Sequence, residues 1–182
     1  IFAAAAGGYL YYRSAPMQGG YNMAVARFTA AESGGPAVSG EDVSKISQYF
    51  FDVIEEEAGR LPAIMRPETR GPDRIPPVRG ADDAARQAVA ERLAKRLKAT
   101  ILVYGQVHLL PDGAYEVQPE FTVESAGFFF GSYITGPSRL GGPIRVETPI
   151  ESGSLALNAE LAARTQALQR LVGGLGAYSV GD

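Results

Sequence analysis

Cysteine and tryptophan are both absent from this chain of 182 residues, and histidine occurs once, at His108. The lack of cysteine excludes disulfide bridges, thiolate metal sites and cysteine nucleophiles. Most transition-metal sites and acid–base relays need several imidazole or thiolate groups, so we expect His108 to be a surface or packing residue rather than a ligand. We therefore expect neither a bound metal nor a cofactor.

A basic surface is also lacking, because 17 Lys and Arg residues face 20 Asp and Glu residues and leave a net charge of −3. The basic residues are interleaved with acids or scattered through loops, which argues against a nucleic-acid partner. Neither a GxxxxGK[ST] nor a GxGxxG phosphate-binding motif is present. A hydrolase would have to use carboxylates such as Asp112 and Glu120, and no further motif supplies a nucleophile or an oxyanion site. The sequence predicts a protein that is not an enzyme.

No apolar run reaches the length of about 20 residues that a helix needs to cross a bilayer. The chain begins with the uncharged stretch IFAAAAGGYLYY, whose tyrosine cluster beside Arg13 resembles the aromatic belt of a membrane interface. We predict that residues 1–13 are the C-terminal part of a membrane anchor. The end of a processed signal segment and a helix packed on the domain are the alternatives. The predicted anchor residues are Ile1, Phe2, Tyr9, Leu10, Tyr11 and Tyr12.

The remaining chain is long enough for one domain with a short appendage. Residues 14–20, SAPMQGG, contain Pro16 and a glycine pair and predict a linker with slack. Residues 21–152 predict an α/β domain, with α+β as the alternative, because strand-like apolar runs alternate with helical stripes. We expect a mixed sheet of about 4–5 strands with two core helices. A C-terminal helix is predicted within residues 153–182.

The first core helix is predicted after Ser39, which forms a capping box with Asp42 ahead of an apolar stripe. The preceding run YNMAVARF is typical of a buried strand. After the helix, a short strand is predicted over residues 63–66, and the proline-rich segment 68–79 predicts a surface loop. The arginines of this region suit either a merely solvated loop or the binding of an acidic partner or phosphate, and they are Arg66, Arg70, Arg74 and Arg79.

The second core helix is predicted between Asp82 and Lys98, because acidic residues open it and basic residues close it, as the helix dipole favours. The run from Ile101 to Val107 is almost continuously apolar, which is typical of a strand covered on both faces. Pro111-Asp112-Gly113 then gives a turn, and the alternating residues 115–123 complete a hairpin.

The stretch SAGFFFGSYITGPSRLGGPIRVETP combines aromatic side chains with glycines. It predicts either a strand that folds back over the core or an exposed aromatic patch that meets a partner or the membrane surface. The C-terminal helix has a leucine stripe and ends in small residues and Tyr178, as the first helix of a tetratricopeptide repeat commonly does. Its alternative is a helix that packs back on the sheet. The predicted partner-binding residues are Phe128, Phe129, Phe130, Tyr133, Ile134, Leu168, Leu171 and Leu175.

The order strand, helix, short strand, helix, strand, hairpin resembles the TolB amino-terminal-like domain and, more loosely, the periplasmic domain of the curli-secretion lipoprotein family. The matching residues are Ala24-Val25-Ala26-Arg27-Phe28, where such domains have a strand ending in Pro-Phe, and Ala99 through Val107. Arg27 departs from the usual proline, and the resemblance covers about residues 21–124. It implies a non-catalytic, extracytoplasmic interaction domain that is often joined to anchors or repeats.

These features predict a membrane-anchored scaffold or accessory subunit of a membrane-associated assembly, with its folded domain on the extracytoplasmic side. The expected partners are the membrane, through the N-terminal segment, and other protein subunits. The alternative is a small-ligand-binding sensor module, with its ligand at the strand ends near Phe28, Thr29 and the Gly-rich loop, where open α/β sheets usually bind.

Overall fold

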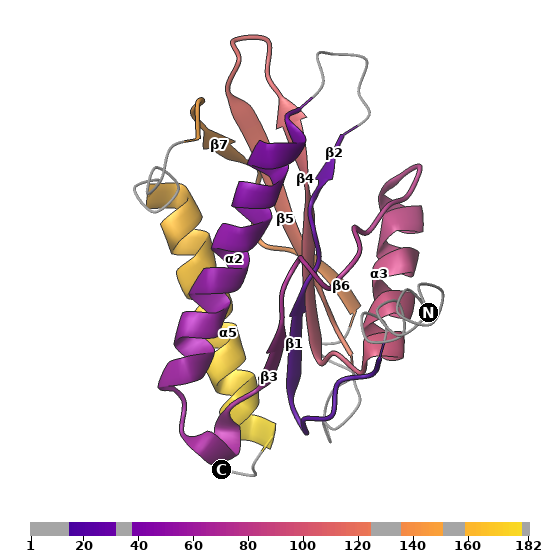
Figure 1. Ribbon diagram of the computed structural model, residues 1–182, viewed down its shortest axis with the longest axis vertical. Helices are drawn as coiled ribbons and strands as arrows, with labels where there is room; N and C mark the ends of the chain where they lie inside the picture. Colours follow the sequence, from indigo (N-terminus) through magenta and orange to yellow (C-terminus); the bar gives the residue numbers. More distant parts are fainter. Residues whose placement is uncertain (1–14, 32–37, 125–135, 151–158, 180–182) are drawn as a thin grey trace, which may run out of the picture.

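The computed structural model of the protein describes residues 15–31, 38–124, 136–150 and 159–179. Within these ranges it is a mixed α/β structure in which three α-helices cover one seven-stranded mixed sheet. Figure 1 shows α2 and α5 on one side of the sheet and α3 on the other. The elements in chain order are β1 (Asn22–Val25), β2 (Thr29–Ala30), α2 (Gly40–Arg60), η1 (Ala63–Met65), β3 (Glu68–Arg70), α3 (Asp83–Leu97), β4 (Ile101–Leu109), β5 (Tyr115–Val123), β6 (Gly136–Arg139), β7 (Ile144–Val146) and α5 (Ala159–Ser179).

The sheet is five positions wide, in the order β3-β1-β4-β5-β6. β1 is parallel to both β3 and β4, whereas β4 and β5 form the predicted antiparallel hairpin. The mixed sheet and the two core helices are therefore confirmed, but the described residues form seven strands rather than about 4–5. The two additional strands are short. β2 pairs with β4, as β1 does, and β7 pairs with β5, as β6 does, so neither makes the sheet wider.

Alternate residues of β4 divide the core into two layers, as the pleat of a strand requires. Ile101 and Val103 pack on the face covered by α2 and α5, while Leu102 and Tyr104 pack on the face covered by α3. The predicted near-continuous apolar strand is thus buried on both faces. The turn between β4 and β5 contains Gly113 at a φ of 90°, a left-handed conformation that glycine adopts without a steric penalty.

Both core helices begin where the sequence predicts, and α3 also ends there. Ser39 caps α2 by accepting from the backbone N–H of Asp42 (3.4 Å), and Asp82 caps α3 by accepting from the N–H of Ala85 (2.7 Å). Such capping satisfies backbone donors that have no partner within a helix. The helix α5 packs on α2, and Leu161 and Leu168 join the core layer between α2 and the sheet.

Two predictions between α2 and α3 are wrong. Residues 63–65 form a turn of 3₁₀ helix instead of a strand, and the strand is β3, inside the segment predicted to be a loop. β3 forms because its backbone pairs with β1, a long-range contact that local propensity does not contain. The segment is also not wholly on the surface, since Ile75 and Val78 are buried beside α3.

The described part of the predicted linker, residues 15–20, is held against the domain rather than slack. The Met17 side chain is buried with the α3 residues of the core, and its N–H donates to the carbonyl of Leu97 (2.8 Å). The Glu68 carboxylate accepts from the N–H groups of Gln18 (2.6 Å) and Gly19 (3.1 Å). We call residues 15–19 the stem.

Among the described residues, no helix is long and apolar enough to span a membrane. The predicted anchor, residues 1–13, lies outside the described residues, so it stays a prediction.

Candidate functional site

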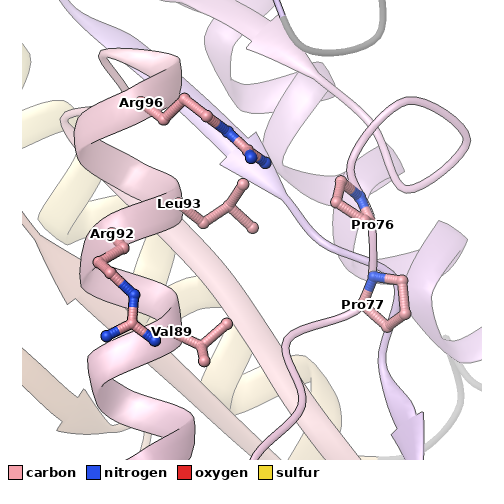
Figure 2. Close-up of a pocket in the computed structure, with 6 residues that line it drawn as sticks. All are labelled: Pro76, Pro77, Val89, Arg92, Leu93 and Arg96. Atoms are coloured by element: carbon pink, nitrogen blue, oxygen red, sulfur yellow. The ribbon is translucent and has the colours of Figure 1, made fainter. Parts of the chain in front are cut away.

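A cleft of about 300 Å³ lies between α3 and the chain that leads to it from β3. We call it the α3 cleft. Figure 2 shows Val89 and Leu93 projecting from α3 toward the two prolines on the opposite wall, with Arg96 reaching across toward Pro76. The residues that line the cleft are Pro76, Pro77, Val89, Arg92, Leu93 and Arg96.

The helix wall presents two adjacent rows of side chains. Val89 and Leu93 are four residues apart, as are Arg92 and Arg96, so each pair lies on one face, separated by about 6 Å along the axis. Leu93 is buried and Val89 half-buried, whereas both arginines are exposed. The helix therefore gives the cleft an apolar floor and a basic rim.

The proline wall is fixed to the domain on both sides of the cleft. Ile75 and Val78 flank the proline pair, and both are 1% exposed. The N–H of Ile75 donates to the carbonyl of Gly71 (3.2 Å), and the N–H of Arg27 donates to the carbonyl of Ile75 (3.4 Å). Because proline also fixes its own φ angle, this wall is formed before any ligand arrives.

The charges of Arg92 and Arg96 are not neutralised within the described part of the chain, where neither side chain has a hydrogen bond or an ion pair. Other arginines on the same stretch of chain are engaged. Arg70 pairs with Glu68 (3.1 Å) and donates to the carbonyl of Ala15 (2.5 Å), and Arg66 donates to the carbonyl of Gly59 (3.1 Å). The two rim guanidinium groups are thus available to a negatively charged ligand.

A buried ion pair fixes the first turn of α3 to the sheet. Arg86 donates to Glu120 of β5 through Nη2 (2.7 Å) and Nε (3.3 Å), and it also pairs with Asp83 (2.9 Å). Asp83 in turn pairs with Arg139 of β6. Tyr104 is opposite Glu120 in the β4–β5 register. The network joins α3 to the sheet and so holds the helix wall of the cleft in place.

Burial and the neighbouring charged groups determine the protonation states of Arg86 and Tyr104. Burial alone would lower the pKa of Arg86, but its hydrogen bonds to Glu120 and Asp83 outweigh that effect and raise the pKa. Burial, followed by the charge of Glu120, raises the pKa of Tyr104. The Arg86 guanidinium is therefore charged at any physiological pH, and the Tyr104 phenol is neutral.

The two carboxylates singled out for hydrolysis have structural partners instead. Glu120 is 2% exposed and is held by Arg86. Asp112 pairs with Arg145 (2.8 Å), and the hydrogen bond from that guanidinium is the main reason why the pKa of Asp112 is lowered. The structure does not bring these two carboxylates together, since Asp112 lies in the β4–β5 turn and Glu120 lies within β5 beneath α3.

The strand-end residues proposed for a small ligand are used in packing. Phe28 is buried and stacks on Phe50 with ring centroids 5.1 Å apart, and its N–H donates to Ser47 Oγ (2.9 Å). Thr29 lies in β2 and donates to the carbonyl of Gly105 (3.3 Å). β2 occupies the place beside β4 that a ligand would need at this end of β1.

The structure describes few of the predicted partner-binding residues. Leu168 is fully buried against the α2 layer and Leu171 is half-buried there, so their side chains contact the domain itself. The Leu175 side chain, the predicted anchor residues and the predicted aromatic patch, residues 128–134, lie outside the described residues. Among the described residues, no group of three or more histidines and acids is placed to hold a metal ion.

Sequence reasoning missed the α3 cleft, although two arginines four residues apart beside an apolar pair are a usable signal on a helix. The sequence gives no signal for the opposite wall of the cleft, because a proline pair in a charged segment is typical of a surface loop. Comparison of the sequence with protein-family models and with curated proteins finds no match. The function is therefore argued from the geometry of the cleft.

Proposed function

We propose that this chain is a membrane-anchored, non-catalytic interaction domain that serves as a scaffold or accessory subunit of a membrane-associated assembly. The observation that carries the proposal is the α3 cleft, which combines an apolar floor, a fixed proline wall and two guanidinium groups that have no ion pair among the described residues. Arginine beside apolar surface is a combination that protein interfaces favour.

The stem supports the membrane part of the proposal. Residues 15–19 are bound to both β3 and the end of α3 through Glu68, Arg70 and the buried Met17. A membrane segment that precedes them would hold the domain close to the bilayer in one orientation, as an accessory subunit requires. The tyrosine cluster that comes before the stem is the sequence feature that favours such a segment.

The resemblance to the TolB amino-terminal-like domain supports an extracytoplasmic location. The order on which that resemblance is based can be traced through β1, α2, β3, α3, β4 and β5, with the short strand β2 in addition to it. A scaffold role is also consistent with the use of Glu120 and Asp112 in ion pairs, which leaves these carboxylates as structural groups.

Extraction of the tagged full-length protein from the membranes of its own host in mild detergent tests this function. We expect the protein in the membrane fraction, and we expect it to elute with other subunits at a fixed stoichiometry. Recovery of the protein alone from the soluble fraction would contradict the proposal. A bound small molecule without protein partners would instead favour a sensor module.

A further inference from the structure

We propose that the α3 cleft binds an extended acidic segment of a protein partner in which an apolar residue stands between two acidic residues. This inference rests on the proposed interaction function and names the chemistry of the partner. It follows from the two rows of side chains on α3, the charge of the rim and the position of the proline wall.

The spacing of the rim arginines matches an extended chain. The Cα atoms of Arg92 and Arg96 are one helical step of four residues apart, which is about 6 Å along α3. Side chains two residues apart on one face of an extended strand are separated by about 6.6–6.8 Å. One extended segment that lies along α3 therefore presents the first and third of three consecutive side chains to the two guanidinium groups.

The middle side chain of such a segment points the opposite way, because successive residues of a strand face opposite sides. On that side of the cleft lies the wall formed by Pro76 and Pro77, next to the floor formed by Val89 and Leu93. An apolar middle residue buries surface there, whereas a polar one loses hydration without a partner. The order acid, apolar residue, acid follows from these two opposite walls.

Carboxylate groups suit this rim better than phosphate. A guanidinium group pairs with a carboxylate through two parallel hydrogen bonds, and Arg92 and Arg96 offer two such groups. A phosphate site normally adds backbone N–H groups from a glycine-rich turn or a helix N-terminus. Here the opposite wall is a proline pair without N–H groups, and both arginines lie in the C-terminal half of α3.

The cleft needs little ordering before it binds. Its proline wall is fixed by the buried Ile75 and Val78, and its helix wall is fixed by the Arg86–Glu120 ion pair. A preformed site loses less conformational entropy on binding, which favours a short segment with a small contact area. A volume of about 300 Å³ is at the lower end of the range of ligand sites and suits one apolar side chain with its neighbours.

The test is the fluorescence anisotropy of a fluorescein-labelled peptide with Glu-Leu-Glu at its centre, flanked by Gly and Ser, titrated with the full chain. We expect saturable binding that weakens as salt is added, because exposed charges are screened. Arg92→Glu and Arg96→Glu should each weaken binding at least tenfold. Arg170→Glu is the matched control, since Arg170 is an exposed arginine of α5 on the other side of the sheet, and it should leave binding unchanged.

Two further peptides test the order of the segment. Gln-Leu-Gln at the centre should bind at least tenfold more weakly than Glu-Leu-Glu, and Glu-Ser-Glu should also bind more weakly. The arginine variants and the unchanged protein should give equal unfolding curves in urea, because the substituted side chains are exposed and have no described partners. Equal curves show that any loss of peptide binding is local to the cleft.

The inference is overturned by the absence of saturable binding, by equal binding of Gln-Leu-Gln, or by an equal loss in Arg170→Glu. Tighter binding of a single-stranded oligonucleotide through Arg92 and Arg96 would also overturn it in favour of nucleic acid. If the peptide does not bind but the detergent-extracted protein still elutes with other subunits, only the proposal of an acidic segment is refuted. Peptide binding by a protein that elutes alone from the soluble fraction refutes the proposed function instead.

Discussion

Arg86 of α3 and Glu120 of β5 form an ion pair of 2.7 Å in which the two side chains are 4% and 2% exposed. The pair lies on the α3 face of the sheet, with Arg139 opposite Glu120 on β6 and Asp83 bridging the two arginines. It is therefore the inner end of a chain of alternating charges that reaches the surface at Asp83 and Arg139.

Removal of Glu120 leaves the buried Arg86 charge with the partly exposed Asp83 as its described partner, and removal of Arg86 leaves the Glu120 charge buried. We predict that Glu120→Gln lowers the free energy of unfolding by about 3–5 kcal/mol, measured by urea denaturation. The double variant Arg86→Met with Glu120→Leu should lose less than either single variant, because an apolar pair needs no compensating charge. Losses that simply add in the double variant would show that the pair does not act as a unit.

The attachment of the stem should depend on pH through Glu68. Burial alone would raise the pKa of this carboxyl, but the N–H groups of Gln18 and Gly19, together with Arg70, outweigh burial and lower it. A group whose pKa is lowered by folding stabilises the folded state above its ordinary pKa, here about 4.5, and this contribution is lost as the pH falls toward the lowered value.

We therefore predict that hydrogen exchange at the Gln18 and Gly19 amides, corrected for the intrinsic rate, becomes less protected below about pH 4.5. In Glu68→Gln, protection of these two amides should be low at neutral pH and should change little on acidification. Unchanged protection in that variant would mean that Met17 and the hydrogen bond from Arg70 to Ala15 hold the stem without Glu68.

Two glycines should respond to alanine in opposite directions. A Cβ at Gly105 would lie 2.6 Å from both the carbonyl oxygen of Gln118 and the Phe28 ring, so Gly105→Ala should destabilise the fold by about 1–3 kcal/mol. Gly59 lies within α2 with open space around it, so Gly59→Ala should stabilise the fold by about 0.5–1 kcal/mol. Thermal unfolding of the two variants measures both effects. A neutral Gly105→Ala would show that the Gln118 carbonyl of β5 and the Phe28 ring can shift at little cost.

The parts of the fold that were predicted correctly depend on local signals. The caps at Ser39 and Asp82 and the turn at Gly113 each involve only a few neighbouring residues. β3 was missed because it depends on pairing with β1, and its own residues, Glu-Thr-Arg, lie in a proline-rich segment. A three-residue strand of this kind has no periodicity that can be recognised.

The candidate site was less predictable for the same reason. Arg86 is one of several charged residues on α3, and its burial depends on Glu120, which is 34 residues away in the chain. The cleft likewise needs the proline pair to lie opposite Leu93, a proximity created by the path of the chain over the sheet. The sequence could indicate a basic helix face, but it could not indicate what that face lies against.

Site-specific photocrosslinking in native membranes tests the central claim, that the α3 cleft is where a protein partner binds. A photoreactive phenylalanine analogue in place of the exposed Pro76 should crosslink to a partner subunit, whereas the same analogue in place of Gln166, exposed on α5, should not. The crosslink should disappear when Arg92→Glu and Arg96→Glu are added. A crosslink from position 166 alone, or one from position 76 that persists without the two arginines, would contradict the account.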